Sequence, residues 1–251
     1  MEDLVSIIMP LYNGEKFIKI TLDSVINQTY KNWELLITND GSKDNSQKIV
    51  EEYSNKDSRI KLFNQINKGS AAARNNSLKN ANGRYIVFLD SDDIWDKNFL
   101  TEQIKFLKEK NASLVFSSYR RINEEEKEIL SPYIVPEKVS YKDLLKTCSL
   151  TCLTSIYDRK KVDIIYFNEK MKSLRDDYVM WLEMFKKIDY AYGNKKVLAS
   201  YRIFSNSTTG KKFKVLKPQF LVYYKIEKLG LVRSIYYFIN WMFISLKKYK
   251  R

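Results

Sequence analysis

The sequence predicts an α/β protein with a mainly parallel sheet, helices on both faces and a basic amphipathic helical tail at the C-terminal end. Short apolar runs alternate with stretches whose apolar residues recur at helical spacing, which is typical of βαβ units. The first such runs end in polar turn clusters, such as Asn13-Gly14 and Asn39-Asp40-Gly41. Residues 211–251 hold eleven Lys and Arg against one acidic residue, and therefore ten of the fourteen net positive charges.

The first hundred residues alternate regularly between the two kinds of element. The apolar run at 5–9 is read as a buried parallel strand, and the spacing after it predicts a helix. Further strands are expected at 33–38, 59–63 and 85–89, with helices at 15–28, 44–53 and 70–80. Because the loops after parallel strands lie at one edge of the sheet, Tyr12, Asp40 and the acids at 90–93 should converge.

The rest of the chain is less regular. Strands are expected at 113–118, 150–157 and 196–201, helices at 141–146 and 175–187, and a charged loop at 123–128. In the tail, Pro218 is placed at the start of one helix because its fixed φ suits a first turn. A second helix is expected at 231–247, with Leu231, Ile235 and Phe238 on one face.

Composition excludes several classes of site. The chain has no His and two cysteines, Cys148 and Cys152, so it cannot form a Cys/His zinc site or a disulfide scaffold. Acid–base chemistry must then fall to Asp, Glu, Lys or Tyr. No G-x-G-x-x-G follows the first strand, which disfavours an NAD-type enzyme. The acidic start and the short apolar run after it do not look like a signal peptide, so we expect unlinked thiols in a cytoplasmic protein.

Three acids, Asp90, Asp92 and Asp93, directly follow the strand expected at 85–89. Carboxylates at the end of a buried strand are unfavourable unless a positive charge lies close to them. Mg²⁺ typically takes one or two carboxylates together with substrate phosphates, so this stretch can be a metal–diphosphate site. It can equally be an acidic helix start, because Asp is a good cap and acids suit a first turn.

Several motifs together carry a family resemblance. PLYNGEKFIKITLDSVINQTY, NDGSKDNS and NKGSAAARNNSLKNANGRYIVFLDSDD resemble the N-terminal half of the family 2 glycosyltransferases of GT-A fold, and the likeness resumes at 175–187 and 201–202. The resemblance implies a nucleotide-diphospho-sugar donor, a divalent metal (Mn²⁺ or Mg²⁺) and inversion at the anomeric carbon. It also implies a catalytic domain at 1–210, with a nucleotide-sugar half at 1–100 and an acceptor half at 101–210, followed by the tail at 211–251.

The resemblance assigns roles around the acidic stretch. Asp92 is the expected metal ligand, Asp90 is expected to hold the ribose or a water near the metal, and Asp93 is expected to orient one or the other. Asp177 lines up with the family's general base, and Asp176 is the second candidate. Both acids also fit simple capping of the helix at 175–187. Phe204 stands where some members carry a metal-binding His, which implies a metal held by one protein carboxylate, phosphates and water.

Nucleotide recognition is expected on the loops before this stretch. Asp40 can accept a hydrogen bond from the N3–H of uracil, with Pro10 and Tyr12 flanking the base, although Asn-Asp-Gly is also an ordinary turn. The remaining candidates are Arg74, which can contact the nucleotide or the diphosphate or form a salt bridge; Ser91, expected among the nucleotide-binding residues; and Arg202, which can contact a phosphate or the acceptor or pair with an Asp.

The tail suggests a partner for the enzyme. Residues 234–246 carry no charge but number 13, fewer than the ~20 that a spanning helix needs. A basic, aromatic-rich amphipathic helix fits the inner face of the cell membrane, although it can also pack on the catalytic domain or on a partner. No nucleic-acid-binding motif accompanies the charge, so nucleic acid is not expected as a partner.

We therefore expect an inverting, metal-dependent enzyme, peripheral at the inner face of the membrane. It would move a sugar from a UDP-sugar to a hydroxyl of a lipid-linked saccharide in bacterial capsule, O-antigen or cell-wall polysaccharide synthesis. The alternative is a catalytically inactive sugar-nucleotide-binding or scaffold protein at the same surface.

Overall fold

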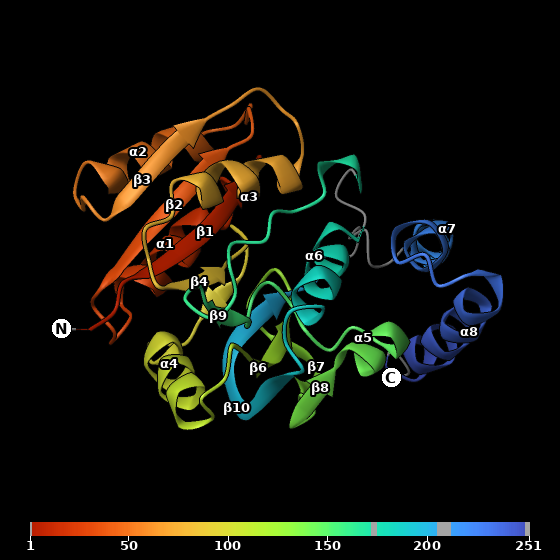
Figure 1. Ribbon diagram of the computed structural model, residues 1–251. Coiled ribbons are helices and arrows are strands. Elements are labelled where there is room, and N and C mark those ends of the chain that lie inside the picture. The colour runs from red at the N-terminus through yellow and green to blue at the C-terminus, as the bar shows by residue number, and fades with distance from the viewer. Residues whose placement is uncertain (1, 172–174, 205–211, 249–251) are drawn as a thin grey trace.

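The computed structural model describes residues 2–171, 175–204 and 212–248 (Figure 1). Within these residues, ten strands form one sheet in the order β3-β2-β1-β4-β9-β6-β10-β5, with β7 added beside β6 and β8 beside β10. The strands are β1 Val5–Leu11, β2 Trp33–Asn39, β3 Ile60–Asn64, β4 Tyr85–Phe88, β5 Ile94–Trp95, β6 Leu114–Ile122, β7 Glu128–Tyr133, β8 Lys138–Ser140, β9 Ile156–Asp158 and β10 Tyr190–Arg202.

The first four long strands pair in parallel, as the sequence predicts. β1 lies between β2 and β4, and β3 pairs with the outer side of β2. Beyond β4 the sheet is mixed, because β9 runs antiparallel between β4 and β6 while β6 and β10 are parallel. Pro10 is tolerated near the end of β1 because β4 pairs with this strand only as far as Ile8, so no ladder bond is lost on that side.

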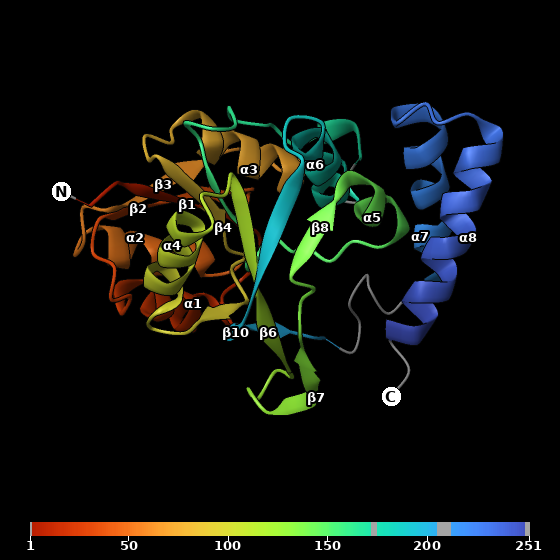
Figure 2. The ribbon, with the colours of Figure 1, turned by 60° about the horizontal axis from the view of Figure 1, so that its bottom comes forward.

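Helices cover both faces of the sheet, which confirms the predicted fold class (Figure 2). They are α1 Ile18–Ile26, α2 Ser46–Ser54, α3 Ser70–Lys79, α4 Phe99–Glu109, α5 Tyr141–Lys146, α6 Asp176–Phe185, α7 Lys212–Leu221 and α8 Leu231–Lys248, with a 3₁₀ turn η1 Glu169–Met171 and a π-helix η3 Val222–Ile226. Two buried clusters form the core. One holds apolar residues of α1, α2 and α4, and the other those of α3, α5, α6 and η3.

The alternation of side chains along the strands explains the two clusters. Ile7 of β1 and Leu35 of β2 belong to the first cluster, while their neighbours Ile8 and Leu36 belong to the second. Successive strand side chains point to opposite faces, so continuous apolar runs require cover on both sides. All four of these side chains are fully buried.

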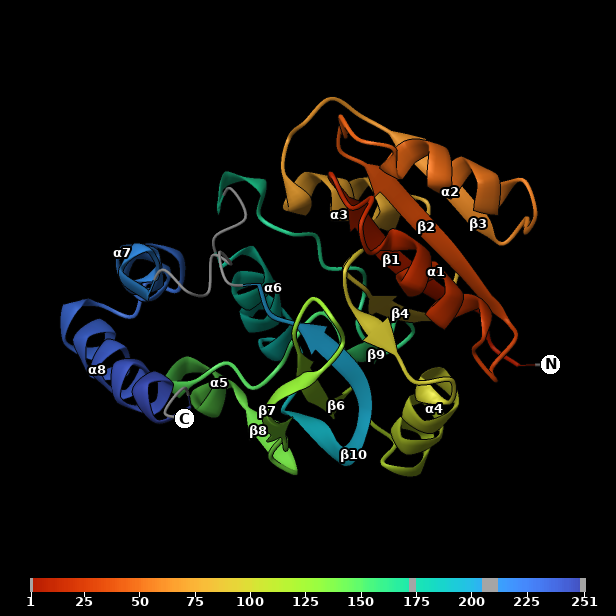
Figure 3. The same cartoon turned by 180° about the vertical axis from the view of Figure 1, so that it is seen from behind.

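The tail packs on the second face, beside α5 and α6 and away from α1 and α2 (Figures 1 and 3). Val222 and Tyr223 of η3 are fully buried in the second cluster, and the Tyr223 hydroxyl donates to the Leu145 carbonyl at 2.6 Å. In the described part of the chain no helix is both long and apolar enough to span a bilayer.

Several element boundaries differ from those expected. Pro218 lies inside α7, which begins at Lys212, rather than at its start. A proline lacks the N–H that a helix interior uses, and the chain changes to a π-helix four residues later, at Val222. The strand expected at 150–157 is restricted to Ile156–Asp158, and α4 lies in a stretch where no helix was expected.

Candidate active site at the carboxyl edge of the sheet

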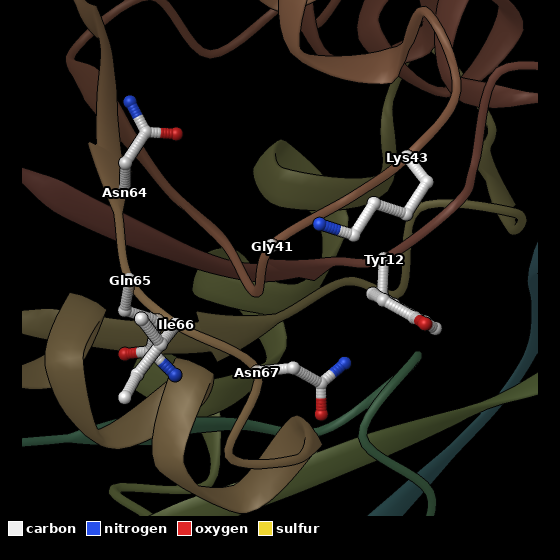
Figure 4. A pocket seen from close by; sticks show the side chains of 7 residues that line it. All are labelled: Tyr12, Gly41, Lys43, Asn64, Gln65, Ile66 and Asn67. Atoms are coloured by element: carbon white, nitrogen blue, oxygen red, sulfur yellow. The ribbon is translucent and has the colours of Figure 1, made fainter.

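A pocket of about 460 Å³ lies where β1, β2 and β3 end (Figure 4). Tyr12 and Lys43 border one side of it, and Asn64, Gln65 and Ile66 border the other. Tyr12 is half exposed and Ile66 is 76% exposed, so each presents apolar surface that no other part of the chain covers fully. Gly41 and Asn67 complete the lining. The arrangement suits a flat ring between two apolar groups with amide groups at its edge.

Asp40 does not line the pocket, but it holds the loop at 65–69 that does. The side chain is 3% exposed, and its two oxygens accept hydrogen bonds from the Gln65 amide and from the backbone N–H groups of Lys68 and Gly69, each at 2.8 Å. Gly69 has a φ of 92°, a conformation that favours glycine, and α3 begins at the next residue. Asp40 therefore fixes both the pocket loop and the start of α3.

The acidic stretch after β4 forms a tight loop held from two other elements. Arg202 at the end of β10 donates its backbone N–H to Asp93 at 2.8 Å and its Nε to the Asp92 carbonyl at 2.9 Å. The Thr21 hydroxyl of α1 lies within hydrogen-bond distance of the carbonyls of Ser91 and Asp93. The sequence left open whether Arg202 contacts a ligand or pairs with an Asp. In the structure Arg202 holds this loop through hydrogen bonds.

These acids have unusual protonation behaviour. Burial, together with the charge of Asp90, raises the pKa of Asp92 to about 6, although Arg202 and Arg74 act in the opposite direction. Burial and the charges of Asp92 and Asp90 raise the pKa of Asp93 well above its ordinary range. Two nearby arginines thus do not neutralise the loop. The raised pKa values mean that a further positive charge would stabilise the ionised forms of Asp92 and Asp93. Carboxylates in this condition suit a cation site.

Arg74 of α3 connects the acidic loop to α6. Its guanidinium donates to Asp90 at 2.5 Å and to Asp176 at 3.3 Å, and it lies 5.2 Å from the ring centre of Phe167. The Arg74 side chain is 9% exposed and that of Asp176 is 7% exposed. Burial raises the pKa of Asp176, while Arg74 opposes that rise. Of the alternatives open for Arg74, the structure shows the salt bridge.

Asp177 is the neighbour of this ion pair on the first turn of α6. Its Oδ1 accepts the backbone N–H of Tyr178 at 2.7 Å. Asp177 is only partly buried, whereas Asp176 is buried. The carboxylates of Asp90 and Asp176 thus meet on one guanidinium, and Asp177 is the next residue after Asp176. Asp40 is linked to the same group through α3, which it anchors at Gly69 and which carries Arg74.

The acidic loop fits a divalent cation with few protein ligands. Among the described residues, no group of three or more Asp, Glu, Cys or His side chains is placed to hold a metal. Asp92, with its raised pKa, is the first candidate ligand, and Asp90, which already pairs with Arg74 and is 35% exposed, is the second. One or two carboxylates are what Mg²⁺ usually takes from a protein when phosphates supply the other ligands.

Sequence reasoning missed most of the pocket lining. Lys43, Gln65, Ile66 and Asn67 were not among the candidates, although each follows the end of β2 or β3. The expectation that these loops converge was the available signal. That expectation covered the loops after β1 and β2, but no residue of the loop after β3 was named as a candidate.

The sheet with helices on both faces, the pocket at the ends of β1 to β3 and the acidic loop after β4 agree with the GT-A fold of nucleotide-sugar transferases. The chain belongs to the glycosyl transferase family 2, whose family model matches residues 6–199. The chain is therefore a glycosyltransferase.

Relatives of known name cover the whole chain. The UDP-Glc:alpha-D-GlcNAc-diphosphoundecaprenol beta-1,3-glucosyltransferase WfgD of Escherichia coli is 42% identical over 252 residues, which span 99% of this chain and 96% of WfgD. WfaP of Escherichia coli, which carries the same activity in its name, is 36% identical over 245 residues, spanning 95% of this chain and 94% of WfaP.

Solved structures show the same fold. TarS 1–349 of S. aureus, in complex with UDP, matches with a TM-score of 0.67 at 25% identity, over 86% of this chain and 65% of that one. The mannosyltransferase PcManGT of Pyrobaculum calidifontis, in complex with GDP-Man and Mn²⁺, matches with a TM-score of 0.69 at 16% identity, over 92% of this chain and 66% of that one, and supports the fold alone.

Proposed function

We propose that this glycosyltransferase moves a sugar, with inversion, from a UDP-sugar to a hydroxyl of a saccharide carried on a polyprenyl diphosphate. The observation that carries the proposal is the pocket at the ends of β1 to β3 beside the Asp90–Arg74–Asp176 group. The names of WfgD and WfaP support the donor and acceptor class, and make UDP-Glc the first donor to test. The product would enter cell-surface polysaccharide synthesis.

The donor would lie across the carboxyl edge of the sheet. Uracil would occupy the pocket between Tyr12 and Ile66, with the Lys43 ammonium available to a phosphate or a ribose hydroxyl. Asp40 would act mainly by holding the loop at 65–69 in the shape that receives the base, and its short backbone hydrogen bonds support that role. The diphosphate would then reach the loop of Asp90 and Asp92.

Transfer requires a base on the side of the sugar opposite the diphosphate. A hydroxyl is a weak nucleophile at neutral pH, so a carboxylate must accept its proton as it attacks. Asp177 would do this, since Asp176 is held by Arg74. A divalent cation on Asp92, with Asp90 beside it, would supply charge stabilisation to the leaving nucleoside diphosphate. A single displacement with one base inverts the anomeric centre.

The exposed face of α8 supports contact with the inner face of a membrane. Val232, Ile235 and Ile239 are exposed on it, Val232 to 81%, and Phe243 is 64% exposed. Basic residues dominate the tail, which is the charge pattern that anionic lipids attract. The enzyme would then meet a lipid-linked acceptor at the membrane surface that anchors the acceptor. Replacing both Ile239 and Phe243 by Ser should release the protein from sedimenting anionic vesicles, and unchanged binding would contradict this part.

A catalytically inactive sugar-nucleotide-binding protein is the competing function. The test is transfer of labelled glucose from UDP-Glc to a synthetic GlcNAc-diphospho-lipid, with and without Mn²⁺. We expect product that is lost in Asp177→Asn and retained in Asp189→Asn, an exposed acid on another part of the chain. UDP binding with no transfer from any UDP-sugar would favour the inactive protein.

A further inference from the structure

We infer that Arg175 is a positioning residue, whose guanidinium rests on Trp241 of α8 and so ties the start of α6, with Asp177, to the tail. The inference rests on the proposed role of Asp177 as the base. It gives the tail a part in the reaction that is separate from any membrane contact, because the inner face of α8 would help to place a catalytic carboxylate.

The backbone of Arg175 adopts an uncommon conformation. Arg175 directly precedes Asp176 and has a φ of 67° and a ψ of 16°, a left-handed conformation that is uncommon for a residue with a side chain. Such a conformation persists only where surrounding contacts hold it. Since α6 begins at the next residue, this conformation fixes how Arg175 is placed relative to the first turn of α6, which carries Asp177.

The side chain supplies the holding contact. The guanidinium carbon of Arg175 lies 5.0 Å from the ring centre of Trp241 and 5.7 Å from that of Tyr178. Both distances are within the ~6 Å over which an aromatic face attracts a cation. The Nε of Arg175 is buried and makes no hydrogen bond within the described residues. Aromatic rings, one of them from the tail, therefore hold this cation.

Trp241 can act as a fixed support because the tail is anchored to the catalytic part elsewhere. Lys186, the residue directly after α6, pairs with Glu227 at 3.1 Å, and the Glu227 side chain is 1% exposed. The ring of Tyr223 lies 6.4 Å from that of Tyr178, one turn into α6. These contacts hold η3 and α8 against α5 and α6, so Trp241 reaches Arg175 from an element already docked there.

The two faces of α8 can be changed separately. Trp241 packs with Phe238 at a ring distance of 5.9 Å, on the side where Tyr237 meets Tyr223 at 6.2 Å. Val232 and Phe243 lie on the opposite side of the helix by its 3.6-residue period, and both are exposed. Asn240 belongs to neither side, and its side-chain amide donates to the Tyr236 carbonyl of the same helix at 2.8 Å. Asn240→Ala therefore serves as a control that alters α8 without touching Arg175.

The test is a double-mutant cycle on transfer to a soluble acceptor with a short lipid chain. Arg175→Ala and Trp241→Leu each remove the cation–ring contact, and Leu keeps an apolar side chain in place of the ring. We expect kcat to fall about 10-fold in each with the KM for UDP-sugar unchanged, since misplacement of a reacting group by about 1 Å can reduce the rate 100-fold. The kcat of the double variant should also fall about 10-fold and no further, because both substitutions remove the same contact.

Conservative and control variants separate positioning from general damage. Arg175→Lys and Trp241→Phe keep a cation over a ring and should restore most of kcat, while Asn240→Ala should keep wild-type kcat on the soluble acceptor. The inference would be overturned if the losses of kcat multiplied in the double variant, if the KM for the donor rose to match, or if Asn240→Ala lost as much activity. Failure of the wild-type protein to transfer would instead refute the proposed function.

Discussion

Replacing Asp92 by Asn should stabilise the metal-free protein while removing its transferase activity. Burial and the charge of Asp90 raise the pKa of Asp92 from its ordinary 3.8 to about 6. A tenfold change in a protonation equilibrium corresponds to about 1.4 kcal/mol, so this rise in pKa gives an upper value of about 3 kcal/mol. The neighbouring Asp90 and Asp93 share the penalty, and we therefore expect about 1–3 kcal/mol, or a Tm higher by about 2–8 °C.

The gain in stability of Asp92→Asn should depend on pH. A carboxyl group whose pKa is raised by folding binds more protons in the folded state, so stability falls as pH rises from about 4 to about 6 and stays low above that. The gain in Asp92→Asn should therefore be largest above about pH 7 and small near pH 4. Thermal unfolding in EDTA at several pH values measures it, and Mn²⁺ should raise the Tm of the wild type but not of the variant. A variant less stable than wild type at pH 7.5 would refute this reasoning.

Four further substitutions test the packing of the site and of the fold around it. Arg74→Met leaves the buried Asp176 and the partly buried Asp90 without their shared cation, so urea unfolding should show a loss of about 3–5 kcal/mol, and a loss below 1 kcal/mol would contradict the ion-pair network. Asp40→Ala frees the pocket loop and should weaken UDP binding, measured by calorimetry, about 10-fold or more. Gly193→Ala would place a Cβ 2.0 Å from the Pro136 carbonyl oxygen and should cost about 1–3 kcal/mol, whereas Gly230→Ala, with open space around it, should cost less despite its φ of 76°.

Local patterns predicted the first half of the fold because the signals there are themselves local. The strand expected at 33–38 is Trp33–Asn39, and the helix expected at 70–80 is Ser70–Lys79, each bounded by polar or glycine-containing turns. The helix α4 carries the spacing of Leu100, Ile104 and Leu107, all buried, and was accessible to the same method although no helix was expected there.

The later strands depend on pairing between distant segments. β9 has three residues and gains its place only by pairing with β4 on one side and β6 on the other. No turn or periodicity near Ile156 indicates those partners, so its direction and its length were not available from the sequence. The same holds for the Arg74–Asp176 contact, which joins residues 102 positions apart.

The two aspartates at the start of α6 illustrate how structure narrows a choice that sequence leaves open. As neighbours on a first turn, both are suited by charge to a helix N-terminus, and the family likeness alone does not separate them firmly. Asp176 is buried against Arg74, and a proton taken there would weaken an ion pair that also holds Asp90. Asp177 is only partly buried and accepts a hydrogen bond from the N–H of the next residue. A base must be able to gain and release a proton without dismantling the site that holds the donor, and that requirement favours Asp177.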